Sequence, residues 1–585
     1  MNKIEDIHEF KLPIEYCSKK NRINTTICQD IELNNIKNPS GTWKKGISRK
    51  SLYNNVFLPK TEIGLELLDA WNKTISYDKK YIKCSQKLYK KVDVSPCEDV
   101  DDIFKLWLSV KNDTGFLSKY HYVDWDFFEY LNKNEGFLQL MSIYSLSSPV
   151  FSLMLPVFLL IVPFFLLKIQ RINISVSRYF EILKDLFSKL PIGRLFRMEN
   201  MSWDNRVYTI VSVLFYFFQI YQNILSCYRF YKNQYYMEDT LNKFKKVADH
   251  SIKQIDIYLE ISENLNNSAY RLFNDNLKLH RERLVKLSGY IDKIKPFKIG
   301  VKPISNIGYK MKHFYEFYKN KEVNKTMNYV FGLNAYFDHI NGIKYHINNC
   351  NINKCKISNN KTTFEQAYFA PLHNKDTCVK NDYSLKNNIL ITGPNAAGKT
   401  TILKTTLFNV ILSQQIGFGF YKSAKITPYK YIHCYLNIPD TSGRDSLFQA
   451  EARRCKEIMD IISESKSNEK HFCIFDEIYS GTNPYEAMAS AHSYLAYLSK
   501  YKNVSFLITT HYIELCKKVD NSNINIKNMH MKIHTDKENN ELVYDYILKS
   551  GISEVKGGIK VLKDLGYPSD MINNTDDYMS KNLGC

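Results

Sequence analysis

NILITGPNAAGKTT, residues 388–401, joins a short apolar run to a glycine-bounded loop and a helix-forming stretch. Gly393, Gly398, Lys399 and Thr400 stand at the spacing of a P-loop, in which a strand, a loop and a helix follow one another. Such a loop turns successive backbone N–H groups toward phosphates, and the helix after it adds the positive end of its dipole. The stretch therefore predicts an α/β P-loop NTPase domain that binds ATP and Mg²⁺.

The predicted nucleotide-binding residues are those of the loop and of the first helical turn. They are Gly393, Pro394, Asn395, Ala396, Ala397, Gly398, Lys399, Thr400 and Thr401. In this motif the lysine reaches the β- and γ-phosphates, and the hydroxyl that follows it binds the metal ion. We therefore expect Lys399 to contact phosphate and Thr400 to be a Mg²⁺ ligand.

A second apolar run, residues 471–475, leads directly into two acids, Asp476 and Glu477. Buried parallel strands read as continuous apolar runs, and ligands bind where such strands end. We predict that Asp476 completes the Mg²⁺ shell and that Glu477 orients or deprotonates the attacking water. A third run, VSFLITT, ends just before His511, which could sense the γ-phosphate, although a lone histidine is more often structural.

Four segments occur in the order and spacing of the MutS family ATPase domain. They are GPNAAGKTT (393–401), SGRDSLFQAEARR (442–454), FDEIYSGTNPYEA (475–487) and TTHYIEL (509–515). The chain resembles this family over roughly residues 330–572, and the resemblance implies an ABC-type ATPase whose nucleotide sites are completed by a second subunit. It also implies that Ser446 is the signature serine, which reaches the γ-phosphate of the other subunit and joins Glu477 and His511 in catalysis.

The chain departs from the family pattern in three places. Ala396 and Ala397 replace a methionine and a further small residue, a change that still permits the loop backbone. Tyr479 and Ser480 replace a Gly-Arg pair. The segment before the loop lacks the aromatic residue that stacks on adenine, and Cys378 or its neighbours occupy that place. The resemblance therefore predicts the hydrolysis chemistry more firmly than it predicts the nucleotide affinity or the base selectivity.

The 585 residues are enough for three to four domains, and the charge is uneven along them. The net charge is +20; residues 1–329 hold 50 Lys+Arg against 35 Asp+Glu, whereas residues 330–585 hold 30 against 25. The basic excess in the first part suits solvated lysines, nucleic acid or an anionic membrane surface. The thirteen cysteines lack C-x-x-C spacing, so we expect reduced thiols.

Two uncharged stretches, residues 149–167 and 207–228, lie within residues 135–230, and the first is apolar enough to cross a bilayer. They predict a transmembrane hairpin, which would keep both soluble parts on the cytosolic side with ATP. The segment between them, 168–206, has eight Lys+Arg against four acids, which favours a shallow or interfacial hairpin instead. A soluble cytoplasmic or nuclear protein with a buried apolar hairpin is the alternative.

The remaining parts are predicted to be mainly helical. Residues 1–134 have helical periodicity and no catalytic cluster, no secretory signal opens the chain, and residues 231–329 form a connector of long polar helices. Residues 548–573 resemble the helix-turn-helix through which the ATPase domains of the family dimerise, so we expect a homodimer within the 330–585 domain. Phe314 and Glu316 match a Phe-x-Glu mismatch wedge, but no mismatch-recognition domain surrounds them, and we predict a coincidence.

These features favour a membrane-associated, dimeric MutS-like ATPase that couples ATP binding and hydrolysis to movement of its attached helices. A DNA-binding mismatch repair or recombination factor with an apolar core hairpin is the second hypothesis. A membrane scaffold whose nucleotide site only switches conformation is the third. Nucleic acid binding is possible in the first case and required in the second.

Overall fold

The computed structural model describes most of the chain. The described residues are 9–34, 51–170, 175–189, 191–196, 201–265, 268–296, 306–359, 361–436, 446–522, 524–535, 542–553, 562–563 and 565–582. They form two compact units. Unit 1 contains residues 1–98, 253–280 and 328–585, and unit 2 contains residues 99–252 and 281–327.

These units divide the chain differently from the sequence-based domains 1–134, 135–230, 231–329 and 330–585. The first predicted domain is split at residue 98, and part of the predicted connector belongs to each unit. Packing joins segments that are distant in sequence, which local composition does not reveal.

Unit 1 is built on a six-stranded sheet with the order β13-β12-β6-β11-β10-β9. The strands are β6 (Asn388–Thr392), β9 (Tyr431–Tyr435), β10 (His471–Asp476), β11 (Val504–Thr510), β12 (Ile526–Thr535) and β13 (Leu542–Ser550). All neighbours pair in parallel except β13, which pairs antiparallel with β12 at one edge. The carboxyl ends of β6, β10 and β11 therefore meet at one edge of the sheet, as the three apolar runs predicted.

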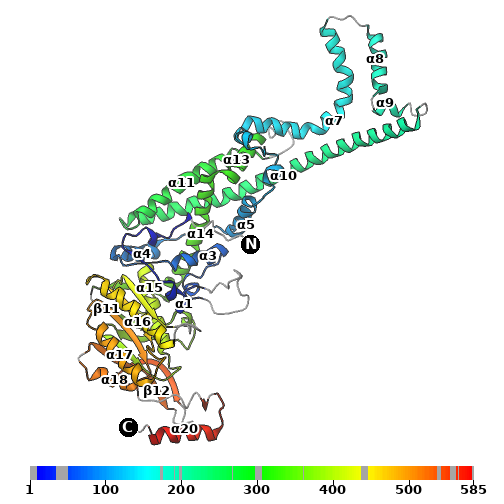
Figure 1. The fold of residues 1–585 in the computed structure, drawn as a ribbon. Coiled ribbons are helices and arrows are strands. Elements are labelled where there is room, and N and C mark those ends of the chain that lie inside the picture. The colour runs from blue at the N-terminus through cyan, green and yellow to red at the C-terminus, as the bar shows by residue number, and fades with distance from the viewer. Residues whose placement is uncertain are drawn as a thin grey trace. The chain divides into compact units, whose positions relative to one another are not determined.

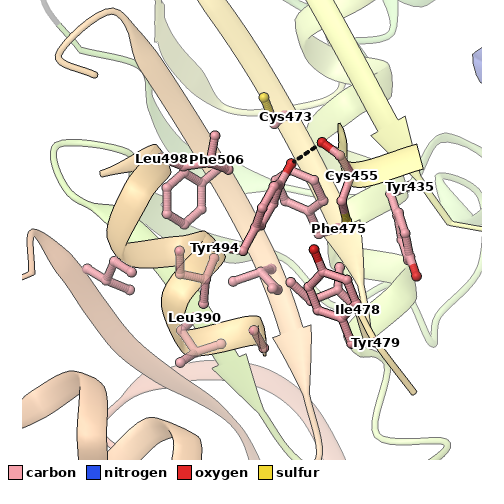
Figure 2. Close-up of a cluster of buried hydrophobic side chains, with 14 of the residues drawn as sticks. Leu390, Tyr435, Cys455, Cys473, Phe475, Ile478, Tyr479, Tyr494, Leu498 and Phe506 are labelled. Carbon is pink, nitrogen blue, oxygen red and sulfur yellow. Dashed lines mark hydrogen bonds between the residues drawn. The ribbon is translucent and has the colours of Figure 1, made fainter. Parts of the chain in front are cut away.

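Helices cover both faces of this sheet (Figure 1). They are α15 (Lys399–Gln415), α16 (Leu447–Glu464), α17 (Pro484–Leu498) and α18 (Ile513–Asp520). One face packs against α16, α17 and α18 in the cluster of Figure 2, where Phe475 and Phe506 lie among aliphatic side chains and Tyr494 Oη donates to the carbonyl of Cys455 at 3.1 Å. The other face contacts α15. Period-two alternation along each strand supplies both apolar faces.

The N-terminal part of unit 1 covers the outer side of α15. Its elements are η2 (Pro13–Tyr16), β1 (Lys20–Arg22), α1 (Thr25–Asp30), α2 (Leu52–Phe57), α3 (Glu62–Trp71), β2 (Thr74–Ser76) and α4 (Lys79–Lys91). Gln415 Nε2 donates to the carbonyls of Trp71 and Thr74, and Gln414 Nε2 donates to that of Ser76. Because α15 is enclosed on both sides, its glutamines are buried and need these partners.

A smaller sheet in unit 1 has the order β5-β4-β8-β3-β7. Three of its strands come before the P-loop helix α15 in the chain, and two come after it. Its strands are β3 (Asn353–Ile357), β4 (Thr363–Ala367), β5 (Asn381–Ser384), β7 (Phe418–Gly419) and β8 (Ser423–Ile426), with η5 (Ala370–Leu372) between β4 and β5. Tyr383 Oη and Thr406 Oγ1 lie 2.8 Å apart, which ties β5 to α15.

Unit 2 is helical. Its own helices are α5 (Val100–Lys111), α6 (Phe116–Lys119), η3 (Asp126–Lys133), α7 (Glu135–Ile169), α8 (Val176–Lys189), α9 (Pro191–Leu195) and α13 (Ile307–Lys319). Three more begin in one unit and end in the other: α10 (Trp203–Asn264), α11 (Arg271–Asp292) and α14 (Lys321–Asn348). Gly308 allows α13 to approach α7, because a Cβ there would lie 2.3 Å from the carbonyl oxygen of Glu135.

Phe314 belongs to the aromatic core of unit 2. It is fully buried, and its ring stacks on Phe116 with a centroid separation of 5.3 Å. Glu316 lies 3.1 Å from His313 Nδ1 on the same helix. A side chain enclosed in this way cannot enter a base step, which agrees with the prediction that the Phe-x-Glu match is a coincidence.

Helices α7 and α10 carry the two predicted apolar stretches, and α10 also contains the start of the predicted polar connector. At about 1.5 Å per residue, the 62 residues of α10 extend for roughly 90 Å. Pro149, Pro156 and Pro163 lie within α7, which bends between two limbs in Figure 1. Proline interrupts the backbone hydrogen-bond ladder and is a usual cause of such bends.

By length and composition, α7 (within Glu135–Met154) and α10 are long and apolar enough to cross a membrane. Core helices of soluble proteins can pass the same test, but they are mostly buried, whereas 11% of each apolar window is buried here. Both helices expose large apolar side chains. Among them are Val150, Phe151, Leu153, Phe158, Ile161, Phe165 and Leu166 of α7 and Leu214, Phe215, Phe217, Phe218, Tyr221 and Ile224 of α10.

The C-terminal segment differs in part from the predicted helix-turn-helix at residues 548–573. Residues 548–550 are the end of strand β13 rather than the start of a helical motif, because they pair with β12. Residues 554–561 and 564 lie outside the described residues. Gly566 has a left-handed turn conformation, with φ of 73°, and helix α20 (Ser569–Asn582) follows it. Dimerisation through this segment stays a prediction.

Candidate active site

The loop between β6 and α15 has a backbone that only part of its sequence favours. Gly398, which caps α15, has φ of 90°, and Ala396 has φ of 63°, an uncommon angle for a residue with a Cβ. Right- and left-handed residues in succession make a concave row of N–H groups that binds anions. Ala397 is buried beneath the loop, whereas Asn395, Ala396, Thr400 and Thr401 are exposed.

Lys399 is buried at the centre of the loop, with 5% of its side chain exposed. Its Nζ donates to the carbonyls of Gly393 at 2.7 Å and Pro394 at 3.3 Å, and lies 3.1 Å from Glu477 Oε1. These contacts hold the ammonium group beside the loop, where phosphate oxygens would be competing acceptors. The position suits phosphate binding by Lys399, which stays a prediction.

Asp476 lies at the carboxyl end of β10, next to the first turn of α15. Thr400 Oγ1 donates to Asp476 Oδ2 at 2.7 Å, and Thr509 Oγ1 of β11 donates to Asp476 Oδ1. The hydroxyl of Thr400 and the carboxylate of Asp476 are hard oxygen ligands of the kind that Mg²⁺ prefers, and they are already adjacent. These two residues thus fit a Mg²⁺ ion, and Thr509, which the sequence reasoning missed, orients the carboxylate.

Glu477 follows immediately with φ of 50°, and its N–H donates to the carbonyl of Thr509 at 3.2 Å. Its carboxylate lies between His511, whose Nδ1 is 3.5 Å from Oε2, and the ammonium of Lys399. The hydrogen bond from His511 and the charge of Lys399 outweigh burial and lower the pKa of Glu477 from 4.5 to about 2. The carboxylate is therefore ionised at neutral pH, as a water-activating group must be.

Ser446 lies at the N-terminus of α16, where it is exposed. Its Oγ accepts from the N–H of Gln449 at 3.3 Å, and the Gln449 side chain accepts from the Ser446 N–H at 3.0 Å, which forms a capping box. Residues 437–445, including all of the SGRD sequence at 442–445, lie outside the described residues. The role of Ser446 toward a second subunit stays a prediction.

Glu451 is a functional candidate that the sequence reasoning missed. It is 3% exposed on α16, and its carboxylate accepts from Ser480 N at 3.2 Å, from Ser480 Oγ at 2.9 Å and from Gly481 N at 3.1 Å. A Cβ on Gly481 would lie 2.7 Å from Leu447 Cγ, so the loop after the two acids packs closely on α16. Ser480, which departs from the family pattern, has a structural role here, because its hydroxyl donates a hydrogen bond to Glu451.

Tyr546 of β13 is a second candidate that the sequence reasoning missed. It lies against the end of the P-loop, since a Cβ on Gly398 would be 3.0 Å from Tyr546 Cδ1, and the residue is 43% exposed. Asn381 Nδ2 donates to its carbonyl at 3.1 Å. Cys378, which was expected near the base, has its pKa raised by burial and offers no ring for stacking. The only sequence signal was a tyrosine in an edge strand 147 residues after Lys399.

Comparison with known protein families matches residues 389–582 to MutS domain V. This part of the chain is similar to the MutS family. The match covers β6, the P-loop, both acids, His511 and α20. MutS domain V is the ATPase domain of its family, and the α/β sheet flanked by helices agrees with it.

Individual MutS relatives match a similar region. The chain is 31% identical over 206 residues to "DNA mismatch repair protein MutS" of Leuconostoc mesenteroides, covering 34% of this chain and 23% of that protein. It is 28% identical over 197 residues to "MutS protein homolog 4" of Mus musculus, covering 33% and 20%. The match thus spans less than a quarter of the length of these relatives.

Proposed function

We propose that this MutS-like chain is a Mg²⁺-dependent ATPase that works as a homodimer at a membrane and passes ATP-driven changes to its attached helices. The observation that carries the ATPase proposal is the meeting of Lys399, Thr400, Asp476 and Glu477 at the carboxyl ends of β6 and β10. These are the parts that phosphoryl transfer to water requires: a phosphate cradle, metal ligands and a base.

Lys399 and the loop N–H groups would bind the phosphates, and Thr400 and Asp476 would hold Mg²⁺. When bound, the ion supplies charge neutralisation at the β- and γ-phosphates. Phosphate oxygens replace the carbonyls of Gly393 and Pro394 and compete with Glu477 for Lys399. Glu477 then faces the γ-phosphate and accepts a proton from the attacking water, while His511 holds the second carboxylate oxygen. Tyr546 is positioned to stack on the base, since an exposed ring beside the loop offers a flat apolar face.

Glu451 gives a path from this site to the predicted subunit contact. The loop after Asp476 and Glu477 is bonded to Glu451, and Glu451 lies on the helix whose first residue follows Ser446. A shift of the loop when ATP binds is thereby passed to the N-terminus of α16. We propose that this N-terminus meets the γ-phosphate held by the partner subunit, which the positive end of a helix dipole favours.

The membrane part of the proposal rests on an inverted arrangement of side chains in α7 and α10. Their large apolar side chains are exposed, whereas polar groups connect the two helices: Tyr216 Oη donates to the carbonyl of Ser152 at 3.2 Å, and Asn223 Nδ2 donates to Ser152 Oγ. Membrane helices associate in this way, with polar groups facing each other and apolar groups facing lipid. Because α10 is one helix from Trp203 to Asn264, the apolar stretch and unit 1 are joined by a continuous element.

Subunit mixing tests the composite site. Lys399→Ala and Ser446→Ala chains should each be nearly inactive, whereas mixed dimers keep one site without either lesion. Random pairing of equal amounts should regain about a quarter of the wild-type ATPase rate, if the two sites act independently. The readout is phosphate release at several total concentrations.

Ser446→Asp is the matched control for helix capping, because aspartate keeps the N-cap acceptor but places a negative charge toward phosphate. It should preserve the melting temperature and still fail to hydrolyse ATP. Full activity of Ser446→Ala alone, with a rate per chain that stays constant down to a demonstrated monomer, would overturn the composite site.

The second candidate function is DNA binding in repair or recombination; the name of one relative, "DNA mismatch repair protein MutS", favours repair. The two candidates differ in the partner of the exposed apolar helices and of the basic part of the chain. Carbonate extraction of the membrane fraction, together with duplex DNA binding over a salt series, separates them. DNA binding that falls steeply with salt, by a protein that carbonate releases from membranes, would favour the repair function.

A further inference from the structure

Unit 1 contains a cavity of about 1140 Å³ that is separate from the ATPase site. Its walls come from the N-terminal segment, the start of α4, the link between α10 and α11, and the loops that precede β9 and β10. Lys430 and Lys470 are the residues immediately before these two strands. The cavity therefore lies at the amino ends of β9 and β10, and the carboxyl end of β10 leads into Asp476 and Glu477.

Six lysines line this cavity, which we call the lysine cavity. They are Lys19, Lys79, Lys80, Lys430, Lys466 and Lys470. Among the described residues of its lining, the acids are Asp78 and Glu469. Like charges gathered in a hollow raise the local potential and attract anions from solution.

Both acids are already engaged. Glu469 lies 2.6 Å from Lys430 Nζ and also accepts from Tyr431 Oη at 3.3 Å. Asp78 caps α4 by accepting from the N–H of Lys80 at 2.9 Å. Among the residues that the structure describes, no carboxylate pairs with the five other lysines of the cavity. The lining thus keeps a positive excess.

Two of these amines are brought together at one residue. Lys79 Nζ donates to the side-chain oxygen of Asn359, and Lys470 Nζ donates to the backbone oxygen of the same residue. Partial burial, together with the charge of Lys79, lowers the pKa of Lys470. Two cations held on one neutral residue repel each other, and an anion between them would relieve that repulsion.

We propose that the lysine cavity binds a small anion that carries several phosphate groups. Lysine amines recognise phosphate as strongly hydrated point charges, and charge-assisted hydrogen bonds are the strong ones. The lysines converge on a hollow formed by several chain segments. This geometry suits a compact ligand better than the extended backbone of a nucleic acid, for which basic side chains follow a groove or a surface.

Titration calorimetry with tripolyphosphate tests this proposal on the full chain. The host carries Lys399→Ala, so that the P-loop does not contribute binding. We expect one binding site per chain, with an affinity that falls as salt is added. Lys79→Gln together with Lys470→Gln should weaken binding by about tenfold or more, because two charged donors are lost.

The matched control is Lys502→Gln together with Lys518→Gln, which removes two exposed lysines of unit 1 that do not line the cavity. It should leave the affinity unchanged. Lys466→Gln, at an exposed position, provides a second variant if the first pair lowers the melting temperature, and it should weaken binding severalfold. Equal losses in the cavity and control variants, or no binding of tripolyphosphate to the Lys399→Ala host, would overturn the proposal. Binding of a single-stranded DNA 20-mer that needs Lys79 and Lys470, without tripolyphosphate binding, would do the same.

Discussion

The strands of unit 1 and the helices α7 and α10 are both rich in apolar residues, but their apolar side chains have opposite surroundings. Ile389, Leu390, Phe475 and Leu507 are fully buried between helices. Leu214 is 62% exposed, and many other large apolar side chains of α7 and α10 are exposed to a similar degree. An apolar run in the sequence therefore predicts removal from water without saying what replaces the water. In the sheet it is protein, and in α7 and α10 we propose that it is lipid.

Arginine substitutions test this contrast most directly and have the largest expected effect. Leu507→Arg places an unpaired charge in a central strand, so unit 1 should not fold and ATP binding should be lost. Leu214→Arg with Phe218→Arg should leave ATP binding intact but reduce membrane insertion, since each arginine costs about 2.5–3.5 kcal/mol at the middle of a membrane helix. Fluorescent ATP binding and carbonate extraction are the measurements. Wild-type chain that is soluble without detergent would contradict the lipid environment of α10.

Loss of the proposed base is the next largest effect and concerns only the polar edge of the sheet. Glu477→Gln should slow ATP hydrolysis by about 10²–10⁴-fold while ATP stays bound, because general-base catalysis is lost and the phosphate contacts remain. Lys399→Ala should weaken ATP binding itself. Single-turnover hydrolysis and equilibrium nucleotide binding distinguish the two. If Glu477→Gln hydrolyses ATP at the wild-type rate, another residue is the base.

Loss of Glu451 should have a smaller effect than loss of Glu477. Glu451 contributes buried hydrogen bonds to the stability of unit 1, unlike the exposed apolar faces of α7 and α10. Glu451→Ala leaves Ser480 and Gly481 without an acceptor and should lower the free energy of unfolding by about 1–3 kcal/mol. Ser480→Ala is the milder control, because Glu451 keeps both backbone donors. Denaturant unfolding measures stability, and the ATPase rate should fall for Glu451→Ala by more than for Ser480→Ala. An unchanged rate in both variants would separate Glu451 from the catalytic loop.

The smallest expected effect is the pH dependence of the Glu477 contacts. The folded-state pKa of about 2 lies below the ordinary value of 4.5, so ionised Glu477 stabilises the fold above pH 4.5. This contribution should decrease as the pH falls from 4.5 and be lost below about 2. Comparing the unfolding free energy of wild type and Glu477→Gln at pH 7, 4 and 2 measures it. His511→Ala should raise the pKa of Glu477, so the stabilisation should be lost at a higher pH than in the wild type. A difference in unfolding free energy that is as large at pH 2 as at pH 7 would contradict this assignment.

The sequence by itself predicted the candidate ATPase site to the level of individual residues. Gly398, Lys399 and Thr400 act through the local geometry of one strand, loop and helix, and Asp476 and Glu477 directly end an apolar run. Because parallel strands present their carboxyl ends at one edge, the meeting of these segments could be predicted without coordinates. The sequence predicted the apolar part and the polar part of α10 but assigned them to two separate elements. The structure shows that they form one helix.

Only the tertiary structure decided which distant residues support that site and which segments form one unit. Glu451 on α16 reaches the catalytic loop, Tyr546 reaches the P-loop from an edge strand, and the N-terminal carbonyls of Trp71 and Thr74 satisfy Gln415 on α15. None of these pairs has a fixed spacing in the chain. The lysine cavity has the same origin, because its charges come from several separate segments. The periodicity of a sequence predicts which face of each segment is buried. The partners of a buried polar group, in contrast, depend on how distant segments of the chain pack together.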